Sequence, residues 1–346
     1  MATETRWFSE LDLEQGDGSA LTELDALRHE LEERIAHLLA DNSDQADLLG
    51  LAMRSGALGA GKRMRPLLLM LVARDLGCVS TALVDVACAV EMVHAASLIL
   101  DDMPCMDDAK LRRGKPTIHV QFGEDVAILA SIGLLSRAFC VLAAAHDIPP
   151  AVRARLVATL AETVGAQGLV KGQFLDLRGG QRSASEIATT NELKTGVLLG
   201  AAVDMAAIIA QSDDRVAQSL RAFALATGQA FQLRDDFQDL AGNDSAITGK
   251  DTGKDLGKAN FINTMGADEA RRRLAGHLHD AERYLAEALG PRQRTRRFVR
   301  SMFAQARPEV RPEGRPDLRR APEIGPRPFA DVAAGVPAAA GSANLH

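Results

Sequence analysis

Aromatic residues are scarce in this sequence. The 346 residues include 1 Trp, 1 Tyr and 11 Phe, so that only 4% are aromatic although 47% are hydrophobic. The apolar residues are therefore mainly Ala, Leu, Val, Ile and Met, most of which favour helices or pack between them. A β-sandwich or β-barrel would need more aromatic and β-branched positions and a sustained alternation of apolar and polar residues. The composition predicts an all-α protein.

Positive net charge and cysteine motifs are also lacking. The 40 Lys and Arg residues are outnumbered by 46 Asp and Glu, which gives a formal net charge of −6 and argues against nucleic acid as a partner. The 4 cysteines form no Cys-x-x-Cys pair, and the histidines lack the spacing of a zinc site. We therefore expect reduced cysteines, a cytoplasmic location and anionic ligands held by local clusters of basic residues.

We expect neither a secretory signal nor a membrane span. The first residues carry Glu4, Glu10 and Asp12 and have no apolar core. The run Val126–Ala145 approaches the length that spans a bilayer, but Arg137 interrupts it, and alanine, serine and glycine reduce its hydrophobicity. We interpret this run, which is apolar on nearly all sides, as a buried helix and expect no stable membrane insertion.

Helical spacing of apolar residues extends over most of the chain. Leu24 and Leu27 begin one amphipathic pattern, and short Gly, Pro and Asp breaks separate further segments of this kind. The last stretch is rich in Pro, Arg and Ala and cannot propagate a helix. We therefore expect an N-terminal segment 1–20, one large helical domain 21–305 around a central apolar cavity, and a disordered tail 306–346.

Two groups of aspartates lie at the ends of apolar helical segments. The first comprises Asp101, Asp102, Asp107 and Asp108, and the second comprises Asp235, Asp236 and Asp239. Like charges four residues apart on one helix face repel each other unless a cation lies between them. Pro104 should end the first helix and let Asp107 fold back toward Asp101. Carboxylates without Cys or His partners favour Mg²⁺ bound together with a polyphosphate.

Basic residues accompany both aspartate groups. They occur at a predicted helix start, after the first group and in a glycine-rich loop after the second, and comprise Lys62, Arg63, Arg65, Arg112, Arg113, Lys250, Lys254 and Lys258. These charges exceed the need of one diphosphate, which predicts two anions, one bound through Mg²⁺ and one bound directly by Arg and Lys. The loop is not a P-loop, because it lacks the Gly-x-x-x-x-Gly-Lys spacing and a preceding strand.

Six segments, in this order, closely resemble the trans-isoprenyl diphosphate synthases, in particular bacterial geranylgeranyl diphosphate synthases of carotenoid pathways. They are AGKRMRP from Ala60, EMVHAASLILDDMPCMDDAKLRRGKPTIH from Glu91, GQFLDL from Gly172, LKTG from Leu193, FQLRDDFQD from Phe231 and GKDTGKDLGK from Gly249. The resemblance covers residues 21–303 and implies the isoprenoid synthase fold and a homodimer. Ala60 departs from the family pattern, because it replaces the usual first glycine of the Gly-Gly-Lys-Arg motif.

The resemblance also implies a role for each matching residue. Three Mg²⁺ ions would be held by Asp101, Asp102, Asp107, Asp235 and Asp239, with Asp236 and Lys194 as further catalytic residues. Isopentenyl diphosphate would be bound by Lys62, Arg65, His94 and Arg113. The allylic diphosphate would be contacted by Arg112, Lys194, Thr195, Gln232, Lys250 and Lys258.

The implied reaction needs no side-chain nucleophile. Mg²⁺ and the basic residues stabilise the leaving diphosphate, the allylic C–O bond ionises, and the double bond of isopentenyl diphosphate attacks the carbocation. Loss of a proton completes a chain that is five carbons longer. The small residues Ala96 and Ser97 precede Asp101 at positions where farnesyl-producing relatives carry a bulky aromatic residue. We therefore expect an open tunnel and a twenty-carbon product, geranylgeranyl diphosphate.

Alternatives remain open within this class and outside it. The product could instead be farnesyl diphosphate or a chain longer than twenty carbons. The protein could also be a non-catalytic subunit of a prenyl diphosphate synthase, although such subunits usually lack one acidic motif. A terpene cyclase would need an Asn/Asp, Ser/Thr, Glu triad in the second motif, which Asn243, Ile247 and Asp251 do not form.

Overall fold

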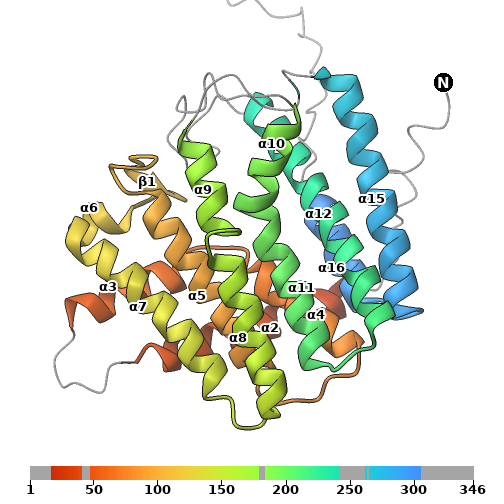
Figure 1. Cartoon of the computed structure of the whole chain (residues 1–346), viewed down its shortest axis with the longest axis horizontal. Helices are drawn as coiled ribbons and strands as arrows, with labels where there is room; N and C mark the ends of the chain where they lie inside the picture. The colour runs from red at the N-terminus through yellow and green to blue at the C-terminus, as the bar shows by residue number, and fades with distance from the viewer. Residues whose placement is uncertain (1–16, 41–46, 179–183, 242–261, 263–264, 305–346) are drawn as a thin grey trace, which may run out of the picture. The chain divides into compact units, whose positions relative to one another are not determined.

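The computed structural model describes residues 17–40, 47–178, 184–241, 262 and 265–304, which fold almost entirely into helices (Figure 1). The elements are α2 (Asp17–Leu38), α3 (Leu48–Leu58), α4 (Met64–Asp75), α5 (Leu83–Asp101), β1 (Leu111–Arg112), β2 (Lys115–Pro116), α6 (Ile118–Phe122), α7 (Glu124–Ala143), α8 (Pro150–Val164), α9 (Leu169–Leu177), α10 (Ala184–Asn191), the π-helix η1 (Glu192–Gly196), α11 (Val197–Ile209), α12 (Asp214–Ala241), α15 (Ala267–Leu289) and α16 (Arg294–Ala304). The prediction of an all-α protein is confirmed.

The described residues belong to one of two units into which contacts divide the chain. This unit is Met1–Ala306, and the other is Arg307–His346. The predicted N-terminal segment lies almost wholly outside the described residues, and the predicted tail lies wholly outside them.

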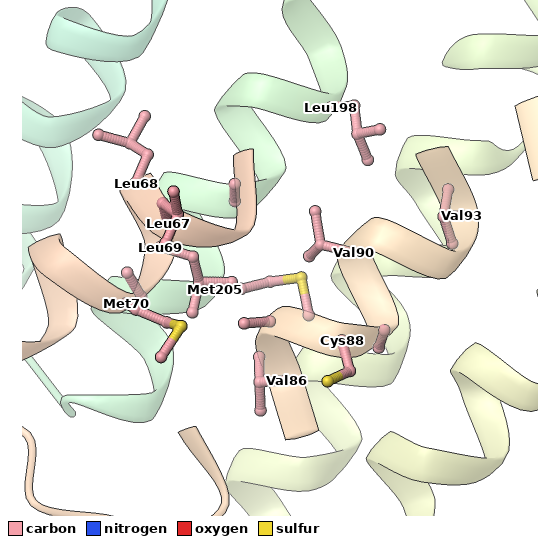
Figure 2. Close-up of a cluster of buried hydrophobic side chains, with 14 of the residues drawn as sticks. Leu67, Leu68, Leu69, Met70, Val86, Cys88, Val90, Val93, Leu198 and Met205 are labelled. Atoms are coloured by element: carbon pink, nitrogen blue, oxygen red, sulfur yellow. The ribbon is translucent and has the colours of Figure 1, made fainter. Parts of the chain in front are cut away.

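The core of the helical unit is built from α4, α5 and α11, which contact one another. Figure 2 shows side chains from these three helices meeting in one cluster, among them Leu69, Val90 and Met205. α4 is buried without interruption from Pro66 to Ala73, and α11 is buried over most of its length. A helix that is apolar on all sides is stable in water only when other helices surround it.

The remaining helices surround this core. α12 packs on α11 and on α15, α7 packs on α5, and α16 packs on α4. The start of α16 is tied to the end of α4 by Asp75, which is 2% exposed and accepts hydrogen bonds from the backbone N–H and the hydroxyl of Thr295 at 3.0 and 2.8 Å. A carboxylate at a helix N-terminus satisfies backbone donors that would otherwise lack partners.

The prediction that Val126–Ala145 is buried on nearly all sides is wrong for one face of the helix. In α7, Ala130, Leu134 and Ala138 are buried, whereas Ile128, Leu129 and Ile132 are 42%, 53% and 57% exposed. The inner face packs on α5. The outer face has no apolar cover from the part of the chain that the structure describes.

Two helices, α5 and α7, are long and apolar enough to cross a membrane by length and composition alone. Their most apolar windows are 67% and 39% buried, respectively. A core helix meets the same criterion, and α5 is such a helix because it contacts both α4 and α11.

Candidate active site

The first aspartate group follows the end of α5. The helix ends at Asp101, and the backbone N–H of Asp107 donates to the carbonyl oxygen of Asp101 at 2.9 Å. The turn at Pro104 therefore folds Asp107 back toward Asp101, as the sequence predicts. Burial raises the pKa of Asp101 to about 6, an effect that Lys194 opposes and Asp107 increases. A bound cation would stabilise the ionised form of such a carboxyl group.

Asp102 is held by Arg112 of β1. The Asp102 side chain is buried, and Nε and Nη2 of Arg112 donate to its two oxygens at 2.7–2.9 Å. Burial raises the pKa of Asp102, and the hydrogen bonds from Arg112 act against this rise. The resemblance assigns Asp102 to metal binding and Arg112 to the allylic substrate. In this structure the two residues are partners of each other.

A cluster of positive charge lies at the start of α4, beside α5. Nη1 of Arg65 is 3.5 Å from Nε2 of His94. Burial lowers the pKa of His94 well below its usual value, and the guanidinium groups of Arg65 and Arg113 lower it further. Burial likewise lowers the pKa of Arg65 and of Arg113. The structure therefore brings together Arg65, His94 and Arg113, three of the four residues to which the resemblance assigns isopentenyl diphosphate, and Lys62 is exposed on the adjoining loop.

Arg63 shapes the loop that carries this cluster. It adopts a left-handed backbone conformation with a φ of 50° at the N-cap of α4. Its side chain, 3% exposed, donates to Glu91 at 2.7 Å, to Glu32 at 3.0 Å and to the carbonyl oxygen of Gly59 at 2.8 Å. Arg63 therefore faces the protein interior, where it pairs with Glu91 and Glu32.

Lys194 lies in the π-helix η1, an insertion that occurs frequently at functional sites. Its Nζ forms an ion pair with Asp176 of α9 at 2.6 Å. A Cβ atom at Gly172 would stand 2.5 Å from the backbone nitrogen of Lys194, so only glycine lets α9 approach η1 this closely. The glycine of the GQFLDL segment thus places Lys194 where it acts on Asp101.

The second aspartate group lies near the C-terminal end of α12. The side chain of Asp235 is 51% exposed and pairs with Arg234 at 3.0 Å, and its charge also acts on Arg65. Asp236 is buried, and Nε2 of Gln232 lies 3.4 Å from its Oδ1. The structure therefore places Asp235 near the cationic cluster and Gln232 one helical turn away from both aspartates.

Some predicted site residues cannot be placed. Lys250, Lys254 and Lys258 lie outside the described residues, as do the side chains of Thr195 and Asp239. Among the described residues, no group of three His, Cys, Asp or Glu side chains is close enough together to hold a metal ion. The donor set nevertheless suits Mg²⁺, because the hard carboxylate of Asp101, whose charge burial disfavours, also feels the negative charge of Asp107.

A cavity of about 440 Å³ adjoins these residues, between η1 and α11 on one side and α12 on the other. Leu193 and Gln232 are among the residues that line it. The two predicted chain-length residues do not line it. Ala96 is fully buried, with its carbonyl oxygen accepting from Ser131 of α7 at 2.6 Å, and the hydroxyl of Ser97 donates to the carbonyl oxygen of His94 at 2.9 Å. Their role in chain length stays a prediction.

Three residues with a clear structural role received no role in the sequence analysis. They are Glu91, which pairs with Arg63, Asp176, which pairs with Lys194, and Gly172, which allows α9 and η1 to meet. All three belong to segments that carry the family resemblance. An acidic residue inside an otherwise apolar helix, as Glu91 is in α5, was the signal that could have revealed the buried pair.

The structure is an all-α bundle with aspartates at two helix ends and arginine side chains near them, a donor set that suits anions and a divalent cation. Residues 47–283 match the polyprenyl synthetase family, and the chain belongs to this family. Geranylgeranyl diphosphate synthases from Pseudescherichia vulneris and Pantoea ananas are each 48% identical to it. These alignments cover 81% and 79% of this chain and 91% and 90% of the relatives.

Solved structures agree with this assignment. An FPP/GFPP synthase from Zymomonas mobilis in its apo form is 31% identical, with a TM-score of 0.73 over 82% of this chain and 98% of that chain. A geranyltransferase from Helicobacter pylori, complexed with magnesium and isoprenyl diphosphate, is 26% identical, with a TM-score of 0.72 over 83% of this chain and 97% of that chain. The predicted resemblance to the trans-isoprenyl diphosphate synthases and the predicted isoprenoid synthase fold are confirmed.

Proposed function

We propose that this chain is a Mg²⁺-dependent prenyltransferase that condenses isopentenyl diphosphate with an allylic diphosphate and releases geranylgeranyl diphosphate. The observation that supports the proposal is that one bundle carries both a cluster of basic side chains and two groups of aspartates. Arg65 and Arg113 lie near His94 of α5, and the aspartates lie at the ends of α5 and α12. The similarity to geranylgeranyl diphosphate synthases over about four fifths of the chain supports the product assignment.

The isopentenyl diphosphate site is the cationic cluster. Arg65 is half-buried, so water screens its attraction for a diphosphate less than at the surface, whereas Arg113 is exposed. His94 is neutral in this environment and donates or accepts a hydrogen bond without adding charge. Lys62, exposed on the loop, supplies a further cation at the entrance.

The allylic diphosphate is bound by the two aspartate groups with Mg²⁺ between them. Asp101, Asp102 and Asp107 on one side and Asp235 and Asp239 on the other would hold three ions, which supply charge to the leaving diphosphate when bound. Arg112, Lys194, Thr195, Gln232, Lys250 and Lys258 would contact the substrate directly. The ion pairs of Arg112 with Asp102 and of Lys194 with Asp176 keep these cations at the site in its absence.

In this reaction the side chains stabilise the charge of the leaving diphosphate and position isopentenyl diphosphate. Lys194 and Arg112, whose charges act on Asp101, would stabilise the negative charge that grows on the leaving diphosphate as the allylic C–O bond breaks. Arg65 and Arg113 hold isopentenyl diphosphate so that its double bond attacks the allylic cation, which forms the new C–C bond. The proton lost from the adduct passes to the released diphosphate, and Asp236 acts by orienting Gln232.

The chain would act as a cytoplasmic homodimer without stable membrane insertion. The exposed apolar face of α7, formed by Ile128, Leu129 and Ile132, is the surface that a second copy would cover. A two-fold axis would bring the same face of both chains together, as in most homodimers.

One assay tests the proposed function. The purified full chain is incubated with Mg²⁺, isopentenyl diphosphate and, in turn, dimethylallyl, geranyl or farnesyl diphosphate, and the products are separated by chain length. A twenty-carbon product supports the proposal. A fifteen-carbon end product identifies a farnesyl diphosphate synthase, an alternative suggested by the name of the Zymomonas mobilis structure. Absence of turnover with every primer would favour a non-catalytic subunit.

A further inference from the structure

Arg234 of α12 has no assigned role in the binding of substrate or metal, although it lies between Gln232 and Asp235. Its side chain is 13% exposed, whereas the side chain of Asp235 beside it is 51% exposed. A guanidinium group this deeply buried is costly unless other groups satisfy its charge and its N–H donors. The partners of Arg234 lie on two sides of it, on α16 and on α12 itself.

The first partner is the C-terminal end of α16. Nη1 of Arg234 donates to the backbone carbonyl oxygen of Met302 at 2.9 Å. The guanidinium carbon also lies 4.3 Å from the ring centroid of Phe231 and 5.5 Å from that of Phe303, and the two rings are 4.9 Å apart. Phe231 precedes Arg234 by three residues and therefore shares its face of α12. The side chain of Arg234 thus lies on the face of α12 that meets α16.

The second partner is Asp235. Nη2 of Arg234 donates to Oδ1 of Asp235 at 3.0 Å. Consecutive residues do not face each other on a helix, so this bond needs the long arginine side chain to reach sideways along the helix surface. A charge-assisted hydrogen bond of this kind fixes the rotamer of a half-exposed carboxylate. The bond engages one of the two carboxylate oxygens.

α16 is held at its opposite end as well. Thr295, near the start of α16, donates two hydrogen bonds to Asp75 at the end of α4, and the two helices pack on each other. α4 also carries Arg65, near its start. α16, the blue helix beside α12 in Figure 1, therefore joins the helix that carries Arg65 to the helix that carries Asp235.

Building on the proposed function, in which Asp235 binds Mg²⁺, we propose that Arg234 is a positioning residue of the second aspartate group and that α16 holds it in place. One N–H group of its guanidinium binds the carbonyl oxygen of Met302, and another binds Asp235. The carboxylate therefore has a defined position before the metal arrives. Hydrogen-bond partners of metal-binding carboxylates are worth roughly 10–100-fold in metal affinity.

The experiment follows metal binding without turnover. The Tm of the full chain is measured with inorganic diphosphate and increasing Mg²⁺, and the Mg²⁺ concentration that gives half of the rise is determined. Arg234→Met keeps an apolar stem beside the two rings but lacks both hydrogen bonds, and should raise this concentration by roughly 10–100-fold. Arg297→Met, an exposed change on α16, is the matched control and should leave it unchanged.

Two further variants separate position from charge. Arg234→Lys keeps the positive charge but lacks the planar fork that binds two acceptors in a fixed geometry, so it should recover part of the lost affinity. Phe303→Leu removes one ring from the guanidinium and keeps Arg234 and Asp235, so it should raise the Mg²⁺ concentration by a smaller factor than Arg234→Met. If Arg234→Met does not fold, these two variants decide.

The outcomes that would overturn this role are distinct from a failure of the proposed function. A lower Tm of metal-free Arg234→Met with an unchanged Mg²⁺ dependence would show a purely structural role and overturn the inference. Full recovery in Arg234→Lys would show that charge alone matters, and would also overturn it, as would an unchanged Mg²⁺ dependence in Phe303→Leu. A wild type whose Tm rises equally with and without Mg²⁺ overturns the proposed function itself.

Discussion

Charged side chains of the candidate site form ion pairs with neighbouring side chains. Arg112 satisfies both oxygens of Asp102, and Lys194 lies 2.6 Å from Asp176. Such charge-assisted hydrogen bonds fix side chains whose rotamers would otherwise be free. Arg112 and Lys194 are thus held in place before substrate and metal bind, which lowers the entropy cost of binding.

The protonation of His94 should couple stability to pH. Its pKa is lowered in the folded protein by burial and by the neighbouring guanidinium groups, so below about pH 6.5 the unfolded chain binds a proton that the folded chain does not. The free energy of unfolding should therefore fall as the pH drops below about 6.5. Urea unfolding at a series of pH values should show a smaller fall for His94→Gln than for the wild type. The same fall in both proteins would contradict this account.

Removing one partner of the buried Arg63–Glu91 pair should lower the free energy of unfolding more than removing both partners. Arg63→Met leaves Glu91, whose side chain is 5% exposed, without its main partner, and should cost about 3–5 kcal/mol in urea unfolding. The double variant Arg63→Met/Glu91→Leu removes both charges and should recover most of this loss. A double variant as unstable as the single one would show that the pair is not the cause.

At the scale of elements, the contact of α9 with η1 determines where Lys194 lies. Gly172→Ala places a methyl group 2.5 Å from the backbone nitrogen of Lys194, which forces the two helices apart. We expect a loss of about 1–3 kcal/mol in stability and a fall in kcat that exceeds any change in KM. Gly276→Ala, in open space on α15, is the control. Unchanged kcat in Gly172→Ala would show that the contact does not position Lys194.

The outer face of α7 should mediate dimerisation. Ile132 is 57% exposed in the single chain, and Ile132→Glu would place a charge at the centre of the proposed interface. Light scattering should report a dimer for the wild type and a monomer for this variant. His279→Glu, an exposed change on α15, should leave the dimer intact. A monomeric wild type, or a dimer that persists in Ile132→Glu, would exclude this interface.

At the scale of the whole molecule, the sequence was sufficient for the helical fold and for the location of the first aspartate group. Apolar spacing predicts helices, and Pro104 predicts both the end of α5 and the return of Asp107, because these effects act over a few residues. The left-handed conformation of Arg63 and its pairing with Glu91 were not predicted. They depend on a contact between residues 28 positions apart, and although Glu91 stands out as an acidic residue in an apolar helix, no local pattern identifies its partner.

The error on α7 has a related cause. Apolar periodicity shows that Ile128 and Ile132 avoid water, but it does not show whether the same chain or another copy covers them. The structure of one chain leaves them exposed. The prediction of burial for α7 is therefore correct for the face that packs on α5. It is wrong for the opposite face, which the single chain leaves exposed.

Metal and diphosphate should stabilise the whole bundle together. A ligand present at about 100 times its Kd adds about 2.7 kcal/mol to the free energy of unfolding. Inorganic diphosphate with Mg²⁺ should therefore raise the Tm, whereas diphosphate with EDTA should raise it less. Asp101→Asn should reduce the Mg²⁺-dependent part of the shift, since it removes a ligand charge from the first aspartate group. Equal shifts with and without Mg²⁺ would contradict metal-mediated binding.

The central claim is that this chain alone extends an allylic diphosphate with isopentenyl diphosphate to twenty carbons. The most direct test is the chain length of the product made by the purified protein from isopentenyl and geranyl diphosphates in the presence of Mg²⁺. The account predicts geranylgeranyl diphosphate as the main product and none when EDTA replaces Mg²⁺. A product that ends at fifteen carbons, or turnover that persists in EDTA, would contradict it.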